Sequence, residues 1–199
     1  MTTSHASLTG AELHEPKGVA SAPAKTVYVA NGAGSGSWTT LDYDVLPTGT
    51  VIGFAYTQSQ TEVNASTSIP NDNTIPQNTE GTEVLQVTIT PKLSTSYLLV
   101  EVSLTASEQG NTIDVITAAL FLNSETGARA ATQIGQVGST YNSNWGLNYT
   151  MVSGSTAAKT FKVRLGGATV GNWSLNKDLN PNTLGGVFVS SIKVTEIKA

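Results

Sequence analysis

Residues 69–104, IPNDNTIPQNTEGTEVLQVTITPKLSTSYLLVEVSL, carry two alternating apolar runs around one short polar break. The alternating residues are Leu85, Val87 and Ile89 before the break and Leu98, Val100, Val102 and Leu104 after it. Strict alternation over several residues is typical of a β-strand with one buried face. The break at 91–96 begins with Pro91, which has no amide hydrogen to give to a sheet. The stretch therefore predicts two strands joined by a β-hairpin or by a sharp corner of a sheet.

The composition favours an all-β chain of ordinary domain size. Of the 199 residues 39% are hydrophobic and 12% are charged, against about a quarter charged in a typical domain. Ser, Thr, Asn, Gln and 19 Gly take the place of charge, which disfavours helices and favours short strands with many turns. The chain has no cysteine, so neither a disulfide nor a cysteine zinc site can hold the fold together.

Charge and hydropathy exclude two classes of partner. The formal charge of −4 offers no basic face for a nucleic acid. No apolar run approaches the roughly 20 residues that a membrane helix needs, so we expect no membrane insertion. The first ten residues lack the cationic start and the apolar core of a secretory signal.

The rest of the chain continues the pattern of short strands separated by turns. Further strands are predicted at 26–30, 51–57, 113–122, 145–151, 161–165, 173–175 and 187–197, with a weak one at 133–137. Residues 113–122, IDVITAALFL, are apolar on both faces, which indicates a central, doubly buried strand. The last strand changes phase at Ser190 and Ser191, which predicts a bulge there. The expected fold is an all-β sandwich or jelly roll, without a fixed repeat.

Residues 1–40 differ from the body at 41–199. Their large apolar groups are too few and too scattered for a core of their own. We therefore expect an extended N-terminal arm that gains its burial from another chain. The glycine- and serine-rich stretch at 31–37 is predicted to be a flexible hinge between the arm and the body.

Few residues suit catalysis or metal binding. His5 and His14 are the two histidines and both fall in the arm, so the body has no base for a Ser-His-Asp triad. The acidic residues Asp114, Glu101, Glu108 and Glu125 match no recognisable glycosidase spacing. The glycines at 32, 34 and 36 lack the Lys-Ser/Thr of a phosphate loop, and the triplet at 71–73 lacks the rest of a calcium loop and is expected to be a polar turn. We expect no enzyme activity, no cofactor and no metal.

Three aromatic residues of the body, Trp145, Tyr149 and Trp173, could stack on sugar rings. Residues of this kind more often belong to a sandwich core or to a contact between subunits. Both interpretations stay open on the sequence.

Several segments resemble virion proteins of tailed bacteriophages. Residues 8–19, LTGAELHEPKGV, and 27–38, VYVANGAGSGSW, are similar to the N-terminal segment of such proteins. Residues 69–77, IPNDNTIPQ, and 87–92, VTITPK, resemble the jelly-roll domains of phage head fibres and tail fibres. The resemblance implies a homotrimer of jelly rolls packed about a threefold axis, with the shape of tumour necrosis factor.

The resemblance also implies a place in the virus particle. We expect a structural protein of the virion surface, made in the host cytoplasm, that acts as a head fibre or capsid decoration. The arm is expected to bind the capsid or another virion protein through Leu8, Leu13, His14, Glu15, Pro16, Lys17, Val27, Tyr28 and Val29. The alternative is a tail fibre or receptor-binding tip that adheres to a host surface glycan. An enzyme that degrades polysaccharide fits less well, because it needs a longer chain and a carboxylate cleft.

Overall fold

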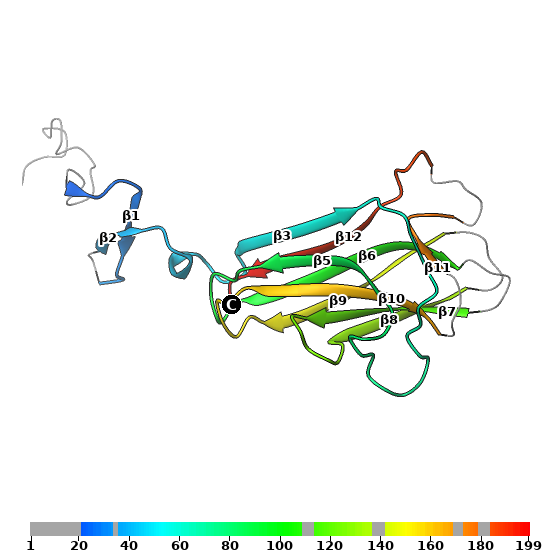
Figure 1. Cartoon of the computed structure of the whole chain (residues 1–199). Helices are drawn as coiled ribbons and strands as arrows, with labels where there is room; N and C mark the ends of the chain where they lie inside the picture. The colour runs from blue at the N-terminus through cyan, green and yellow to red at the C-terminus, as the bar shows by residue number, and fades with distance from the viewer. Residues whose placement is uncertain (1–20, 34–35, 109–113, 137–141, 169–172, 179–183) are drawn as a thin grey trace, which may run out of the picture. The chain divides into compact units, whose positions relative to one another are not determined.

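The computed structural model describes residues 21–33, 36–108, 114–136, 142–168, 173–178 and 184–199. Strands dominate these residues, which contain no α-helix and a short 3-10 helix at Tyr43–Val45. The chain divides into two compact units, Met1–Pro47 and Thr48–Ala199. Figure 1 shows the strands of the second unit, which is called the body below. The all-β expectation is confirmed.

The body consists of two antiparallel sheets. One sheet has the order β5 (Thr82–Ile89), β10 (Lys159–Gly167), β7 (Asp114–Leu122) and β8 (Ala130–Gln136). The other has the order β3 (Val51–Ser59), β12 (Ser190–Ile197), β6 (Tyr97–Glu108), β11 (Trp173–Leu175) and β4 (Val63–Ala65), and β9 (Ser143–Val152) also pairs with β6. Because residues 97–103 of β6 pair with both β12 and β9, these two strands lie on opposite sides of β6.

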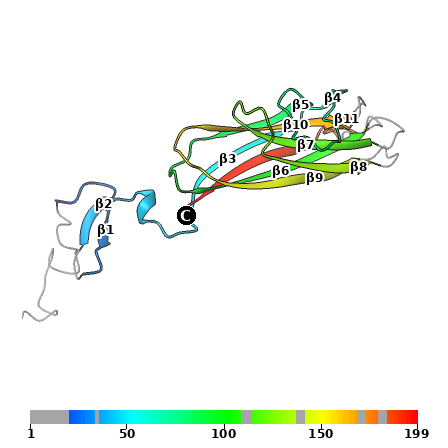
Figure 2. The same cartoon turned by 90° about the horizontal axis from the view of Figure 1, so that it is seen from below.

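The two sheets enclose one apolar core, as in a β-sandwich. All seven alternating residues of 69–104 belong to this core, together with Phe161, Val163 and Leu165 of β10 and Ile192 and Val194 of β12. Figures 1 and 2 show the strands of both sheets running along the same direction of the body. Alternation thus predicted the inward faces of the strands correctly.

The break between β5 and β6 is a corner between the two sheets and not a hairpin turn. β5 and β6 follow each other in sequence, but β5 pairs with β10 and β6 pairs with β12 and β9. The segment between them therefore carries the chain from one sheet to the other. Proline at its start is compatible with this role, because no ladder hydrogen bond is required there.

The central strand β7 is buried on both faces, as predicted. Its second face is covered by the same chain, because Ala119 and Phe121 pack against Ile69 and Ala128. Ile69 belongs to the long polar segment that precedes β5, and it is 1% exposed. The doubly apolar pattern of 113–122 is therefore satisfied within one chain and gives no support to a trimer.

Two details differ from expectation. The last strand begins at Ser190, and its register shift lies between Glu196 and Ile197 rather than at Ser190. In the first unit β1 (Thr26–Ala30) pairs with β2 (Gly36–Thr40), so the predicted hinge at 31–37 forms the connection of a hairpin and the start of its second strand. The segment between this hairpin and the body is 41–47.

Candidate interaction surfaces

The described part of the predicted arm is a two-stranded hairpin with little burial. Tyr28 and Trp38 form a cross-strand pair, with ring centroids 5.5 Å apart in an edge-to-face arrangement. Val27 and Val29 alternate with Tyr28 and therefore face the opposite side of the hairpin. None of the described residues between 21 and 47 is buried. The other predicted anchoring residues, Leu8, Leu13, His14, Glu15, Pro16 and Lys17, lie outside the described residues.

The three aromatic residues proposed to contact a glycan do not form a common exposed surface. Trp173 is 1% exposed, and its indole nitrogen donates a hydrogen bond to the carbonyl of Thr67 at 3.1 Å. Its ring has no free face for a sugar, so of the two interpretations left open by the sequence Trp173 fits the sandwich core. Trp145 and Tyr149 are half-buried and pack from β9 against the main core.

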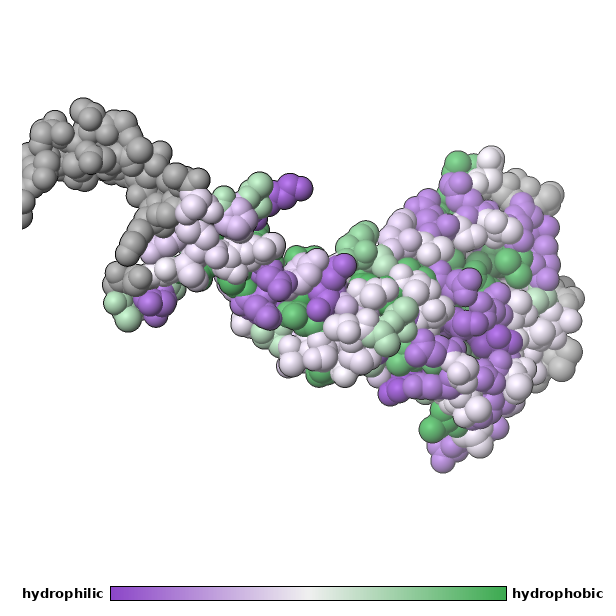
Figure 3. Space-filling model, turned by 60° about the vertical axis from the view of Figure 1, so that its left-hand side comes forward, coloured by the Kyte–Doolittle hydropathy of each residue, from purple (hydrophilic) through white to green (hydrophobic). Residues whose placement is uncertain are grey.

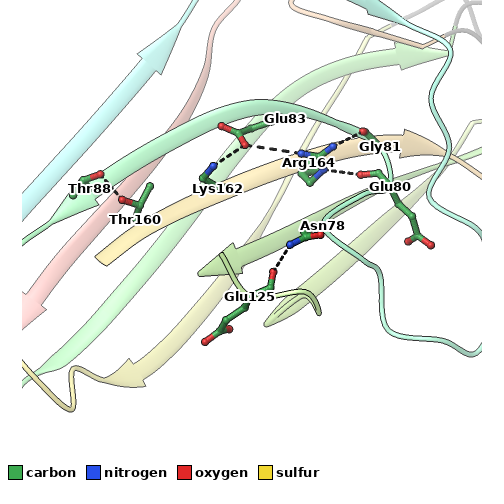
Figure 4. Close-up of polar contacts among 9 residues, drawn as sticks. All are labelled: Asn78, Glu80, Gly81, Glu83, Thr88, Glu125, Thr160, Lys162 and Arg164. Atoms are coloured by element: carbon green, nitrogen blue, oxygen red, sulfur yellow. Dashed lines mark hydrogen bonds and ion pairs between the residues drawn. The ribbon is translucent and has the colours of Figure 1, made fainter. Parts of the chain in front are cut away.

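A polar network covers part of the outer face of the four-stranded sheet (Figure 4). The guanidinium of Arg164 donates to the carbonyls of Glu80 and Gly81 at 2.6 and 2.8 Å, which attaches the segment before β5 to β10. Lys162 forms an ion pair of 3.1 Å with Glu83. The hollow beside this network, of about 330 Å³, is lined by Asn78, Glu83, Phe121, Asn123, Ser124, Lys162 and Arg164. The network holds the chain's own segment in place.

The outer face of the six-stranded sheet carries a group of apolar side chains, of which Leu99 and Ile197 are half-buried and the others exposed. We call this group the apolar sheet face; it consists of Val51, Phe54, Tyr56, Tyr97, Leu99, Val152 and Ile197. Phe54 is 62% and Tyr56 48% exposed, and their rings stack with centroids 6.4 Å apart. Val152 and Tyr97, which are paired across β9 and β6, are 48% and 44% exposed.

Polar residues follow along the same strands. Lys193 of β12 and Glu101 of β6 form an ion pair of 2.8 Å. The hollow there, of about 260 Å³, is lined by Tyr56, Glu101, Val102, Ser103, Asn148, Ser191 and Lys193. An aromatic ring thus stands at the side of a small hollow with charged, amide and hydroxyl groups.

The two acidic candidates whose side chains the structure describes, Glu101 and Glu125, do not lie at one site. Glu101 lies on β6, whereas Glu125 lies in the turn after β7 and pairs with Arg129. The hydrogen bond from Arg129 lowers the pKa of Glu125. In the predicted polar turn the carboxylate of Asp72 accepts hydrogen bonds from the amide and hydroxyl of Thr74 at 2.7 and 2.6 Å.

The described residues contain no group of three His, Cys, Asp or Glu that could hold a metal ion. His5, His14 and Gly34 lie outside these residues, as do the side chains of Glu108 and Asp114. The absence of an enzymatic activity therefore stays a prediction.

The apolar sheet face was not predicted from the sequence. Its signal is present in 51–57, VIGFAYT, where apolar residues occupy both phases of the alternation. The same two-sided pattern occurs at 113–122, where another segment of the same chain covers the strand.

Figure 3 shows another part of the surface, with hydrophilic residues gathered over the right-hand part of the view.

No protein-family model and no curated protein matches this chain. In the part of the chain that the structure describes, no helix is long and apolar enough to span a membrane.

Proposed function

We propose that this chain is a structural protein of a tailed-bacteriophage virion, a homotrimeric head fibre or capsid decoration. Its N-terminal arm binds the capsid or another virion protein, and its body projects as a jelly roll of the tumour-necrosis-factor type. The observation that carries the proposal is the contrast between the two units. The body has its own large core, whereas no described residue between 21 and 47 is buried.

The hairpin of the arm is suited to docking. An isolated two-stranded sheet is marginally stable in water, so contact with a partner would stabilise it. Within the described residues β1 pairs with β2 along one side, which leaves its other side available to a sheet edge of a partner. Val27 and Val29 present an apolar pair on one face of this hairpin, and the residues of 1–20 extend the segment that precedes it.

The two antiparallel sheets of the body support the jelly-roll part of the proposal. Consecutive strands β5 and β6 lie in different sheets, as strands of a jelly roll do. A sandwich of this kind is rigid and self-contained, which suits a projecting domain.

Virions that lack the native copy provide the test. We expect the full chain to bind them and the variant V27E/V29E to lose at least about nine tenths of its occupancy, because two carboxylates would be desolvated at the contact. The control I75E carries a charge at a body residue that is 63% exposed, and it should bind normally. Equal occupancy of all three proteins would show that the hairpin is not the anchor.

A second candidate, adhesion to a host glycan, is favoured by the hollow beside Tyr56. An exposed ring next to Glu101, Asn148 and Lys193 combines a stacking surface with hydrogen-bonding groups, which is what a saccharide requires. Binding to an array of bacterial surface glycans that is lost in Y56A and retained in Y97A would support this function. The absence of binding by the wild type would remove it.

A further inference from the structure

The segment before β5 and the strand β8 enclose a cleft on the outer face of the four-stranded sheet. Backbone hydrogen bonds hold the segment at both ends, from Ile69 to the carbonyl of Gly167 at 3.0 Å and from Ala128 to the carbonyl of Pro76 at 2.9 Å. Two hollows of about 340 and 360 Å³ open between the segment and the sheet. Both are lined by Asp72, Thr74, Pro76 and Ala131, so they are parts of one cleft. We call it the β8 cleft; it is lined by residues 70–76, Thr117 and residues 128–133.

Side chains that stand on the face of the sheet form the floor of the β8 cleft. Ala119 of β7 faces outward, where it packs against Ile69, and Ala131 is its partner on β8. Thr117 and its partner Gln133 lie two residues further along these strands and therefore on the same face. The backbone groups of β8 point along the plane of the sheet instead. A ligand in the cleft is thus recognised by side chains, and a peptide that pairs with the sheet edge would lie elsewhere.

The cleft holds polar side chains in fixed orientations. Nε2 of Gln133 donates to Oδ1 of Asn71 at 3.1 Å and to Oγ1 of Thr117 at 3.0 Å. Oδ1 of Asp72 accepts from the amide and hydroxyl of Thr74 at 2.7 and 2.6 Å. Within the described part of the chain, Oε1 of Gln133, Nδ2 of Asn71 and Oδ2 of Asp72 have no hydrogen-bond partner. Two acceptors and one donor are therefore preorganised for a ligand.

The charges of the lining argue against an anionic ligand. Arg129 is the cation among the lining residues, and its guanidinium is engaged by Glu125. The carboxylate of Asp72 would repel an anion. The remaining lining groups are amides, hydroxyls, aliphatic side chains and the rings of Pro70 and Pro76. A neutral saccharide matches this set, because its hydroxyls both donate and accept hydrogen bonds while its C–H faces lie against the proline rings.

We propose that the β8 cleft binds a neutral saccharide, whose hydroxyls donate to Gln133 and Asp72 and accept from Asn71. This inference rests on the second candidate function, adhesion to a host glycan. It adds a site on the sheet opposite to the hollow beside Tyr56. None of the lining residues is aromatic, so one cleft binds weakly and adhesion depends on several copies acting together.

An array of oligosaccharides tests the cleft with the labelled full-length protein. The array carries neutral hexose and N-acetylhexosamine oligosaccharides beside oligosaccharides that contain uronic acids. We expect the wild type to bind neutral spots. Q133A should lower the signal on these spots at least about tenfold, because it removes an acceptor and releases Asn71. A131F should lower it as much, because the added ring fills the cleft while the hydrogen bonds of Gln133 and Asp72 are kept.

Gln86 provides the matched control. It is an exposed glutamine on β5, at the other edge of the same sheet, and Q86A should bind like the wild type. Y56A, on the opposite sheet, should also keep the signal on these spots. The melting temperatures of Q133A and A131F should stay within a few degrees of that of the wild type, which shows that the cleft and not the fold was changed.

The outcomes separate the inference from the proposed function. A neutral signal that is lost in Y56A but kept in Q133A and A131F would place the glycan beside Tyr56 and overturn the β8 cleft as its site. A wild type that binds only the uronic-acid spots would show that the ligand is not neutral and overturn this inference. A wild type that binds no oligosaccharide would remove the second candidate function together with this inference, and it would leave the attachment of the arm to virions untouched.

Discussion

The carboxylate of Glu196 accepts hydrogen bonds from the backbone amide of Lys92, at 2.8 Å to Oε1 and 2.9 Å to Oε2. The same carboxylate accepts from the amide of Leu93 at 3.1 Å and from the hydroxyl of Ser96 at 2.6 Å. Glu196 is fully buried, at 0% exposure. The last strand thus satisfies the amides of the corner that carries the chain from β5 to β6. A buried carboxylate is tolerated there because three donors, two backbone amides and one hydroxyl, replace its hydration.

Replacing Glu196 by Gln should destabilise the body by about 2–3 kcal/mol, because the amide NH2 group would face donors and the charge-assisted bonds would be lost. Denaturant unfolding measures this loss in the free energy of unfolding. The matched control is E62Q, since Glu62 pairs with Lys177 at 3.5 Å with its side chain 43% exposed and should cost less than about 1 kcal/mol. An equal loss of unfolding free energy in E196Q and E62Q would show that the corner does not depend on the carboxylate.

Arg164 and Lys162 provide a second matched pair on β10. Arg164 has a side chain 19% exposed and holds two backbone carbonyls, whereas Lys162 is 33% exposed and forms an ion pair with Glu83. R164M leaves the carbonyls of Glu80 and Gly81 without their donor and should cost about 2 kcal/mol, against less than about 1 kcal/mol for K162M. Amide hydrogen exchange should speed up around Gly81 in R164M alone. An unchanged rate of amide hydrogen exchange around Gly81 would show that Arg164 does not hold this segment against β10.

Period-2 alternation predicted the strands of this body and their inward faces, because the side-chain direction in a strand is a local property. It did not decide between hairpin and corner at 91–96, since the strands on either side take their partners from distant segments. The partner of Lys92 is 104 residues away in Glu196, and nothing near either residue indicates it. A glutamate at an inward position of a final strand is the one sequence sign of such a contact.

The surfaces were less predictable than the core for a related reason. A strand that is apolar on both faces shows that something covers it, but not whether the cover is the same chain or another one. Ala119 and Phe121 of β7 are covered by Ile69 from a segment that is otherwise polar. The strand at 51–59 has the same kind of pattern, yet Phe54 and Tyr56 remain exposed. The sequence left open whether Trp173 is a core residue or a glycan contact, because an aromatic residue in a short strand gives no sign of its depth, and the structure places it in the core.

The cover over β7 can be tested at Ile69. I69A should cost about 2–4 kcal/mol, because it opens a cavity beside Phe121 and Ala119. It should leave the mass of the assembled protein unchanged, since this cluster is closed within one chain. Thermal unfolding and light scattering give the two readouts. A stability loss accompanied by dissociation of the assembly would place this region at a subunit contact instead.

The pair of Glu125 and Arg129 gives a prediction about acid. The hydrogen bond from Arg129 lowers the pKa of Glu125, so the folded state binds a proton less readily than the unfolded chain. The pair therefore contributes stability at pH values above the ordinary carboxyl pKa and loses it as the pH falls through the lowered value. In R129Q the pKa of Glu125 should rise towards its ordinary value, which an NMR titration of the side chain detects. An unchanged titration would assign the shift to another cause.

The boundary between the two units predicts how the body behaves alone. Gly49 donates to the carbonyl of Lys198 at 2.9 Å, and Lys198 donates to that of Thr50 at 2.9 Å, so the body is tied together from residue 49 onward. A chain that begins at Thr48 keeps both bonds and the whole core, and its melting temperature should lie within a few degrees of that of the full chain. The same chain should fail to join virions that lack the native copy, because it has lost the arm. If it still decorates these particles, attachment resides in the body. If it does not fold, the arm contributes to the core of the assembly and the boundary after Pro47 does not separate independent units.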